Sequence, residues 1–186
     1  MNPLRIRPLH VVAAVVLGAA FLPACHHGLA ASNDPTKPIF KKDGADFSKY
    51  QVVKLHFVEV KTNNNEGVDL LRSAFEDSIK THFGPHFKTV AAGDTAAAGE
   101  ILMDISLNVN WGSRGARMFV GFGAGKADIQ MKYELKDGET LLSSLNEHDS
   151  MSGGADSRAL AFAAADKWNK WYVANVLFPA GAPAPK

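Results

Sequence analysis

Three segments of the chain carry the pattern of β-strands, in which apolar and polar side chains alternate so that one face is buried. Residues 100–111 and 129–135 alternate strictly, and residues 51–60 are rich in β-branched side chains. Asp137-Gly138 follows the second of these segments and predicts a two-residue hairpin turn, with a returning strand over residues 139–148.

Two further segments show the spacing of three and four residues that is typical of an amphipathic helix. The first precedes Gly84-Pro85, a pair that ends a helix. The second covers residues 155–178 and is rich in alanine. The apolar stripes consist of Val68, Leu71, Phe75, Ile79 and Phe83 in the first helix, and of Leu160, Ala164, Trp168, Trp171 and Val176 in the second.

With a short strand over residues 87–90, the element order is strand, helix, short strand, three strands, helix. This order predicts an α+β fold with a mainly antiparallel sheet of four to five strands. We expect the two helices to pack on one face of that sheet.

The N-terminal segment has the features of a bacterial export signal. Arg5 and Arg7 precede an apolar run, residues 11–22, that is too short to span a bilayer comfortably. "LPAC", which ends at Cys25, resembles the lipoprotein signal, in which the cysteine becomes lipid-modified. Ordinary cleavage after Ala30 or Ala31 is an alternative, and so is an uncleaved anchor, although the short apolar run disfavours it.

This interpretation divides the chain into four parts. Residues 1–24 are a lipoprotein signal peptide, 25–48 a flexible tether, 49–178 a single α+β domain and 179–186 a disordered tail. In lipoproteins an Asp directly after the acylated cysteine retains the protein in the inner membrane. His26 stands there, so we expect the outer membrane, with the domain facing the periplasm. The alternative location is periplasmic or secreted.

Composition excludes some classes of protein. The 186 residues are 46% hydrophobic and 21% charged, as in an ordinary small domain. Removal of the signal peptide takes away two of the 20 basic residues, so 18 would remain against 19 acidic ones. There is no basic run, and we expect no nucleic-acid binding. Because Cys25 is the only cysteine, an intrachain disulfide is impossible.

The stretch "GFGAGK", residues 121–126, raises the question of a phosphate loop. A P-loop would need glycine at position 120 and a hydroxyl side chain at 127, where Val120 and Ala127 stand. A strand follows the stretch, whereas both common phosphate motifs need a helix there. We therefore expect a strand with one bare face, which permits close packing or bending. The glycines of this strip are Gly121, Gly123 and Gly125.

The same stretch resembles the core motif of a bacterial family known as domain of unknown function 4410. That motif is an arginine, a hydrophobic pair, GxGxG with a small residue, an alternating strand and an Asp/Gly turn. The resemblance extends over about residues 50–178 and implies an exported protein, since members are often lipoproteins. It implies no catalytic residues. The matching positions are Arg117, Gly121, Gly123, Gly125, Ala127, Asp137 and Gly138.

Few side chains suggest chemistry. Arg114, Arg117 and Lys126 flank the bare strip, and we hypothesise weak contact there with an anionic group or a partner. His82 and His86 are separated by the helix-breaking Gly84-Pro85, so we expect no metal site.

Three further groups of residues have structural interpretations that involve no chemistry. Neighbours in "NEHDS", residues 146–150, point to opposite faces of a strand and cannot form a triad. Asp104 and Asp128 are expected on solvated faces. Trp168, Trp171 and Tyr172 are expected mainly in the core, with a partner surface as the alternative for an exposed Trp171 or Tyr172.

These features favour a non-catalytic outer-membrane lipoprotein that binds or assembles components of the cell envelope, without a cofactor. Its partners would be the membrane, through Cys25, and an envelope protein. The alternative is a small cell-envelope hydrolase with an unidentified active site.

Overall fold

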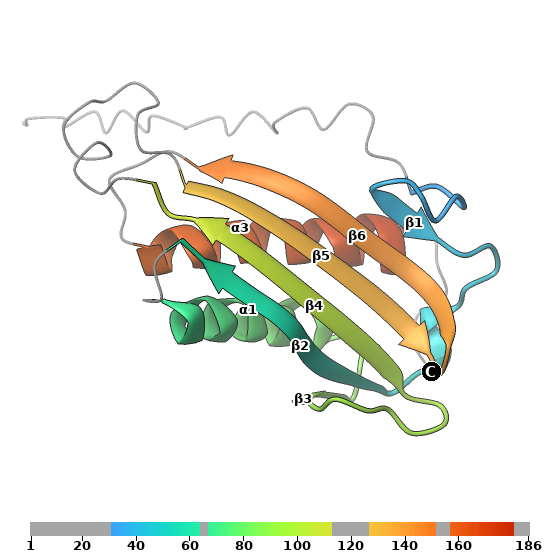
Figure 1. Ribbon diagram of the computed structural model, residues 1–186. Helices are drawn as coiled ribbons and strands as arrows, with labels where there is room; N and C mark the ends of the chain where they lie inside the picture. Colours follow the sequence, from blue (N-terminus) through green and yellow to red (C-terminus); the bar gives the residue numbers. More distant parts are fainter. Residues whose placement is uncertain (1–30, 64–66, 113–126, 152–156, 181–186) are drawn as a thin grey trace, which may run out of the picture.

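The structure is a computed structural model that describes residues 31–63, 67–112, 127–151 and 157–180. It contains one sheet and two long helices (Figure 1). The strands are β1 (Ile39–Lys41), β2 (Val52–Thr62), β3 (Thr89–Ala92), β4 (Ile101–Asn110), β5 (Ala127–Asp137) and β6 (Thr140–Met151). The helical elements are the 3-10 turn η1 (Phe47–Lys49), the helices α1 (Val68–Phe83) and α3 (Ser157–Tyr172), and the π turn η2 (Val173–Leu177).

The sheet has six strands in the order β1-β6-β5-β4-β2-β3. β2 is parallel to both β3 and β4, and the other three pairings are antiparallel. The α+β class is therefore confirmed. The predicted mainly antiparallel sheet of four to five strands is not exact, because the sheet has six strands and is mixed. Alternation reveals a buried face and not the direction of the neighbouring strand, so the sequence pattern could not show that β2 lies between two parallel partners.

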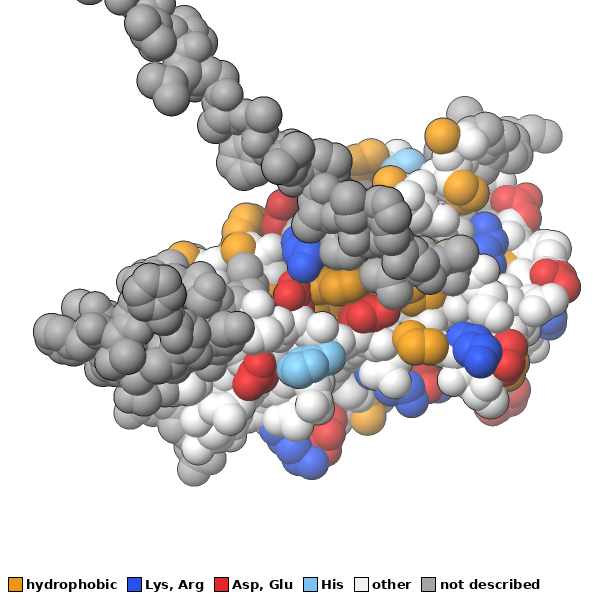
Figure 2. Space-filling model, turned by 90° about the horizontal axis from the view of Figure 1, so that it is seen from above, with side chains coloured by type: hydrophobic (Ala, Val, Ile, Leu, Met, Phe, Trp, Pro, Cys, Tyr) orange, Lys and Arg blue, Asp and Glu red, His pale blue; other side chains and the backbone are white. Residues whose placement is uncertain are grey.

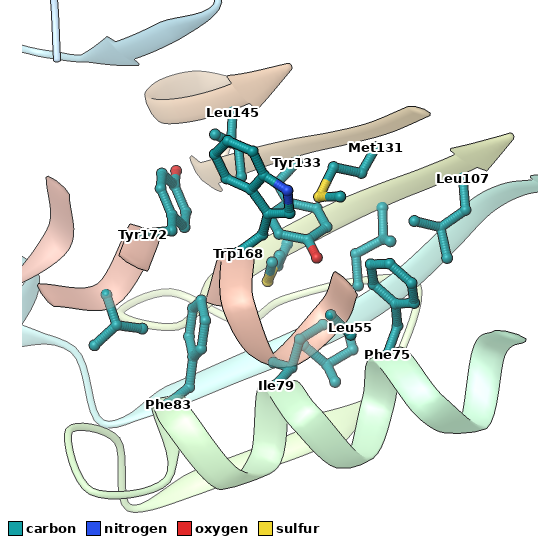
Figure 3. Close-up of a cluster of buried hydrophobic side chains, with 14 of the residues drawn as sticks. Leu55, Phe75, Ile79, Phe83, Leu107, Met131, Tyr133, Leu145, Trp168 and Tyr172 are labelled. Carbon is teal, nitrogen blue, oxygen red and sulfur yellow. The ribbon is translucent and has the colours of Figure 1, made fainter. Parts of the chain in front are cut away.

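Both helices lie on the same face of the sheet, as predicted, and fill the core with it (Figures 1 and 3). The predicted apolar face of β4, from Ile101 to Val109, is buried at every second position. On α1, the stripe from Leu71 to Phe83 is buried as well. Figure 3 shows Phe75, Ile79 and Phe83 of α1 and Trp168 and Tyr172 of α3 among the inward side chains of the strands.

β2 changes face at a bulge, which interrupts its alternation of buried and exposed residues. Phe57 pairs with Ile105 and Glu59 with Ser106, so Val58 is the extra residue and is 55% exposed. A bulge inserts one residue and reverses the alternation beyond it. Val60 therefore packs against the core, whereas an uninterrupted alternation would place it on the face opposite Phe57.

The last part of the segment assigned to a tether is folded into the domain. β1 pairs with β6 at Leu145, Ser144 and Ser143, and Ile39 and Phe47 are buried. Ser32 forms two backbone hydrogen bonds with β1, from its N–H to Ile39 (2.9 Å) and from Lys41 to its carbonyl (2.8 Å). The fold thus begins before residue 49. A three-residue strand after Pro35 and Pro38 gives too short a pattern to be recognised in the sequence.

Candidate functional site

The site residues chosen from the sequence lie outside the described residues. This holds for Cys25, for Arg114, Arg117 and Lys126, and for the glycine strip Gly121, Gly123 and Gly125. Around the glycine strip, the structure describes only the strands on either side, β4 and β5. Asn110, at the end of β4, pairs with Asp128, near the start of β5, so both flanks meet at one end of the sheet.

The face of the sheet opposite the helices carries polar side chains in rows across the strands. The registers of β2, β4, β5 and β6 align these side chains, because residues paired across strands lie on the same face. Three rows result: His56, Asp104, Glu134 and Ser144; Glu59, Ser106, Lys132 and Asn146; and Lys61, Asn108, Gln130 and His148.

An ionic network joins three strands in the first row. Asp104 accepts from Nδ1 of His56 through Oδ1 (2.8 Å) and from Nζ of Lys136 through Oδ2 (2.8 Å). Lys136 also contacts Oε2 of Glu134 (2.7 Å). Hydrogen bonds from Lys132 and Lys136 lower the pKa of Glu134. Asp104 and Glu134 raise the pKa of Lys136 in return. The carboxylates of Asp104 and Glu134 are therefore balanced by the ammonium groups of Lys136 and Lys132.

Next to this network the open face is hollowed only slightly. A depression of about 180 Å³ is lined by Ser106, Asn108, Gln130, Lys132 and Asn146 among others. The amide Nδ2 of Asn108 donates to Oε1 of Gln130 at 3.4 Å. Figure 2 shows another view of the molecule, in which side chains of both charges are interspersed. Amide and hydroxyl groups can donate and accept hydrogen bonds, so the depression suits a polar contact.

The histidines considered for metal binding have separate partners. Nε2 of His82 lies 2.6 Å from Oδ1 of Asp166 and links α1 to α3. His86 stacks on Phe178, with ring centroids 4.2 Å apart, and burial lowers its pKa. Within the described part of the chain, no group of three or more His, Cys, Asp or Glu side chains could hold a metal ion.

The residues of "NEHDS" separate as strand alternation predicts. Asp149 points to the helix side, where Oδ2 accepts from Nε1 of Trp168 (2.9 Å) and from Nζ of Lys167 (2.8 Å). His148 and Ser150 are exposed and pair with Gln130 and Asp128 across β5. Their distribution over two faces rules out a triad within this segment.

The structure also places the two aspartates and the aromatic side chains of α3. Asp104 pairs with Glu134, whereas Asp128 pairs with Asn110, so six residues along the sheet separate the two aspartates. Tyr172 is fully buried and donates to Oγ of Ser143 at 2.7 Å. Trp168 is buried and Trp171 is only partly exposed, which confirms the interpretation of this group as core.

Sequence reasoning missed the ionic network and the N-terminal segment. His56 and Asp104 lie 48 positions apart, and only the register of the parallel pair β2–β4 brings them together. Lys41 donates through Nζ to the carbonyl of Val176 at 2.9 Å. No local motif marks either pair, since each depends on strand order.

The described residues thus define a small α+β domain with a mixed sheet, two helices on one face and a polar open face on the other. The chain belongs to the family called domain of unknown function (DUF4410), whose model matches residues 41–165. No curated protein is significantly similar in sequence.

The fold is similar to that of several solved structures, among them two of PelC. The PelC dodecamer from Paraburkholderia phytofirmans aligns with 72% of this chain and 97% of its own, with 11% identity and a TM-score of 0.52. Its L103M variant aligns with 71% of this chain and 93% of its own, with 10% identity and a TM-score of 0.50. At such identities the likeness concerns the fold alone. No helix among the described residues is long and apolar enough to cross a membrane.

Proposed function

We propose that the protein is an outer-membrane lipoprotein, anchored through Cys25, that serves as a periplasm-facing module for binding or assembling cell-envelope components. Two sequence features support the anchor: the export signal that ends in "LPAC" and the position of Cys25 as the only thiol. His26 after the cysteine supports the outer membrane.

The observation that carries the binding role is the polar face of the sheet. Its rows of amide, hydroxyl and charged side chains are not covered by any helix of the described chain. The depression there is shallow, which suits contact with an extended or protein surface better than enclosure of a small substrate. The proposed role is therefore non-catalytic. The pairs His56–Asp104 and Lys136–Glu134 stabilise this polar face of the sheet.

Assembly of several copies is the first binding mode to test. The PelC structure with the same fold is a dodecamer, and the shared fold makes self-association a reasonable role for this chain. Among the described residues, two sheet edges are paired only in part: β3 pairs with β2 from Val52 to Leu55, and β1 with β6 from Ser143 to Leu145. The contact would use such an edge, the open face or the bare glycine strip, with Arg114, Arg117 and Lys126 beside it.

Cross-linking in intact cells, followed by mass spectrometry, tests this function. The expected result is a reproducible set of cross-links from Lys61 and Lys132 on the open face, either to a second copy or to an envelope protein. Lys80, which lies on α1 and pairs with Glu76, provides the comparison position. The absence of a reproducible envelope partner would contradict the binding role, and a hydrolase would then be the candidate to pursue.

A further inference from the structure

The N-terminal segment is attached to the domain almost up to the proposed lipid. From Ser32 onwards its backbone is held by hydrogen bonds, including Lys42 N–H to the Leu142 carbonyl (2.9 Å) and Asn146 N–H to the Pro38 carbonyl (2.7 Å). Oγ of Ser143 donates to the carbonyl of Phe40 at 2.7 Å. These bonds make residues 32–42 part of the sheet edge, so they cannot act as a free spacer.

Side chains hold the same segment against the rest of the domain. Lys41 reaches the end of the last helix at Val176, and Phe47 packs edge to face with Phe178 at a centroid distance of 6.3 Å. The hydroxyl of Tyr50 donates to Oδ2 of Asp137 at 2.6 Å. The segment is therefore fixed to both the C-terminal turn and the β5–β6 hairpin.

This attachment limits the distance between the domain and the bilayer. Only six residue steps separate Cys25 from Ala31, the first described residue, and a fully extended chain spans about 3.5 Å per residue. The reach is thus roughly 20 Å at most. The tether expected from the sequence, residues 25–48, would have reached about four times as far.

We propose that the surface formed by residues 33–44 together with Leu141 is the membrane-proximal face of the protein and lies against the phospholipid headgroups. This inference rests on the proposed acylation of Cys25. Its occupant is the lipid surface in which the anchor is inserted. The face has an open hollow lined by Asn33, Pro35, Phe40, Lys42, Asp43 and Leu141.

The charges of this face indicate how it meets the bilayer. Lys37 and Lys42 are exposed, and Asp34 and Asp43 balance their charge, whereas the third lysine of the segment, Lys41, turns to the carbonyl of Val176. A balanced surface gains little from anionic lipids, because basic residues attract a bilayer only when they are in excess. The short tether, and not electrostatic attraction, therefore sets the orientation, and it should persist with zwitterionic lipid.

The opposite end of the sheet provides the comparison position. Ser150 is exposed near the end of β6, nine residues beyond Leu141 along the same strand. At about 3.3 Å per residue, the two positions are roughly 30 Å apart. Lys42 lies beside the start of β6, where its N–H donates to the Leu142 carbonyl, so probes on Lys42 and Ser150 report on opposite ends of this strand, and both sites are exposed.

The test uses the acylated full chain in phosphatidylcholine vesicles that contain a headgroup nitroxide quencher. K42C and S150C each receive one fluorophore, because acylation blocks the thiol of Cys25. The expected result is quenching at least about twofold stronger at position 42 than at 150, given the separation of roughly 30 Å. A flexible insertion of 20 Gly/Ser residues between Ala30 and Ala31 adds roughly 25 Å and should reduce this ratio towards one.

The outcomes separate the inference from the function on which it rests. The mass of the N-terminal peptide and flotation with vesicles show whether Cys25 carries lipid. Acylated protein with equal quenching at both positions, or with stronger quenching at 150, overturns the orientation and leaves the anchor intact. Protein without lipid at Cys25 overturns both. A ratio that the insertion leaves unchanged also contradicts the inference, since the tether would then not set it.

Discussion

The Nζ atom of Lys41 lies 2.9 Å from the backbone carbonyl oxygen of Val176, which joins residues 135 positions apart in the chain. The ammonium also lies 3.5 Å from the carbonyl of Leu177 and 5.4 Å from the centroid of the Phe47 ring. It thereby satisfies carbonyls at the end of the last helix, where the last C=O groups lack intrahelical partners. One side chain connects the N-terminal segment to the C-terminal turn.

Replacement of this lysine should loosen both ends of the domain. K41M keeps the aliphatic stem but removes the donor, so we expect a loss of about 1 kcal/mol in the free energy of unfolding. Urea unfolding followed by circular dichroism measures it. K42M is the matched control, because Lys42 is exposed and its change should stay within about 0.5 kcal/mol. Equal effects of the two variants would contradict the role of Lys41.

His86 should make the fold sensitive to mild acid. Burial against Phe178 lowers the pKa of its imidazole below the ordinary value of 6.5. The unfolded chain therefore binds a proton more readily than the folded one, and stability falls as pH drops below about 6.5. The loss is complete below the folded-state pKa. Urea unfolding measures the stability of H86F relative to the native chain. We expect this relative stability to be higher at pH 5.5 than at pH 7.5.

A histidine elsewhere provides the control for this pH effect. His148 is exposed on the open face, so H148F, measured beside H86F at both pH values, controls for the replacement of a histidine by phenylalanine. Titration of the His86 ring protons by NMR gives an independent measure. A pKa at or above 6.5 would contradict the burial argument, whatever the behaviour of the variants.

Two buried tyrosines should respond differently to loss of the hydroxyl. The hydroxyl of Tyr172 donates to Ser143, whereas that of Tyr133 lies near Asn169 but forms no hydrogen bond of good geometry with the described residues. We expect Y172F to cost about 1 kcal/mol and Y133F to be neutral or stabilising. Burial raises the pKa of both groups, so the contrast does not depend on their ionisation near neutral pH. Thermal unfolding compares them, and equal losses would refute the assignment.

The ionic network on the open face should stabilise the sheet modestly and in a salt-dependent way. D104N keeps the shape of the side chain but removes the charge that pairs with His56 and Lys136. We expect a loss of about 0.5–1 kcal/mol at low salt that shrinks at high salt, because ions screen such partly exposed pairs. Denaturant titrations at the two salt concentrations measure it. A loss independent of salt would show that the charges do not contribute.

The sequence predicts the elements of this fold well where burial controls the pattern. β4 buries every second residue from Ile101 to Val109, and α1 ends at Phe83 before the pair Gly84-Pro85, both as expected. Each of these features depends on neighbouring residues alone. A two-residue hairpin between β5 and β6 is also found as expected, but its turn residues are Gly138 and Glu139, because Asp137 still pairs with Thr140.

Features that depend on long-range pairing could not be predicted. The bulge at Val58 reverses the faces of β2, and it exists because of how β2 aligns with β4. β1 has three residues, and pairing with β6, not its own sequence pattern, makes it a strand. The meeting of His56 with Asp104 needs both the strand order and this register. The sequence predicts a tether over residues 25–48 for the same reason, since local residues do not reveal the pairing of β1 with β6.

Metabolic labelling with palmitate tests the central claim, the lipid anchor, most directly. The account predicts that the native protein incorporates labelled palmitate and fractionates with the outer membrane, whereas C25A incorporates none and is released from it. Mass spectrometry of the mature N-terminus should show an acylated cysteine at position 25. A mature chain that starts after Ala30 or Ala31, without label, would contradict the account.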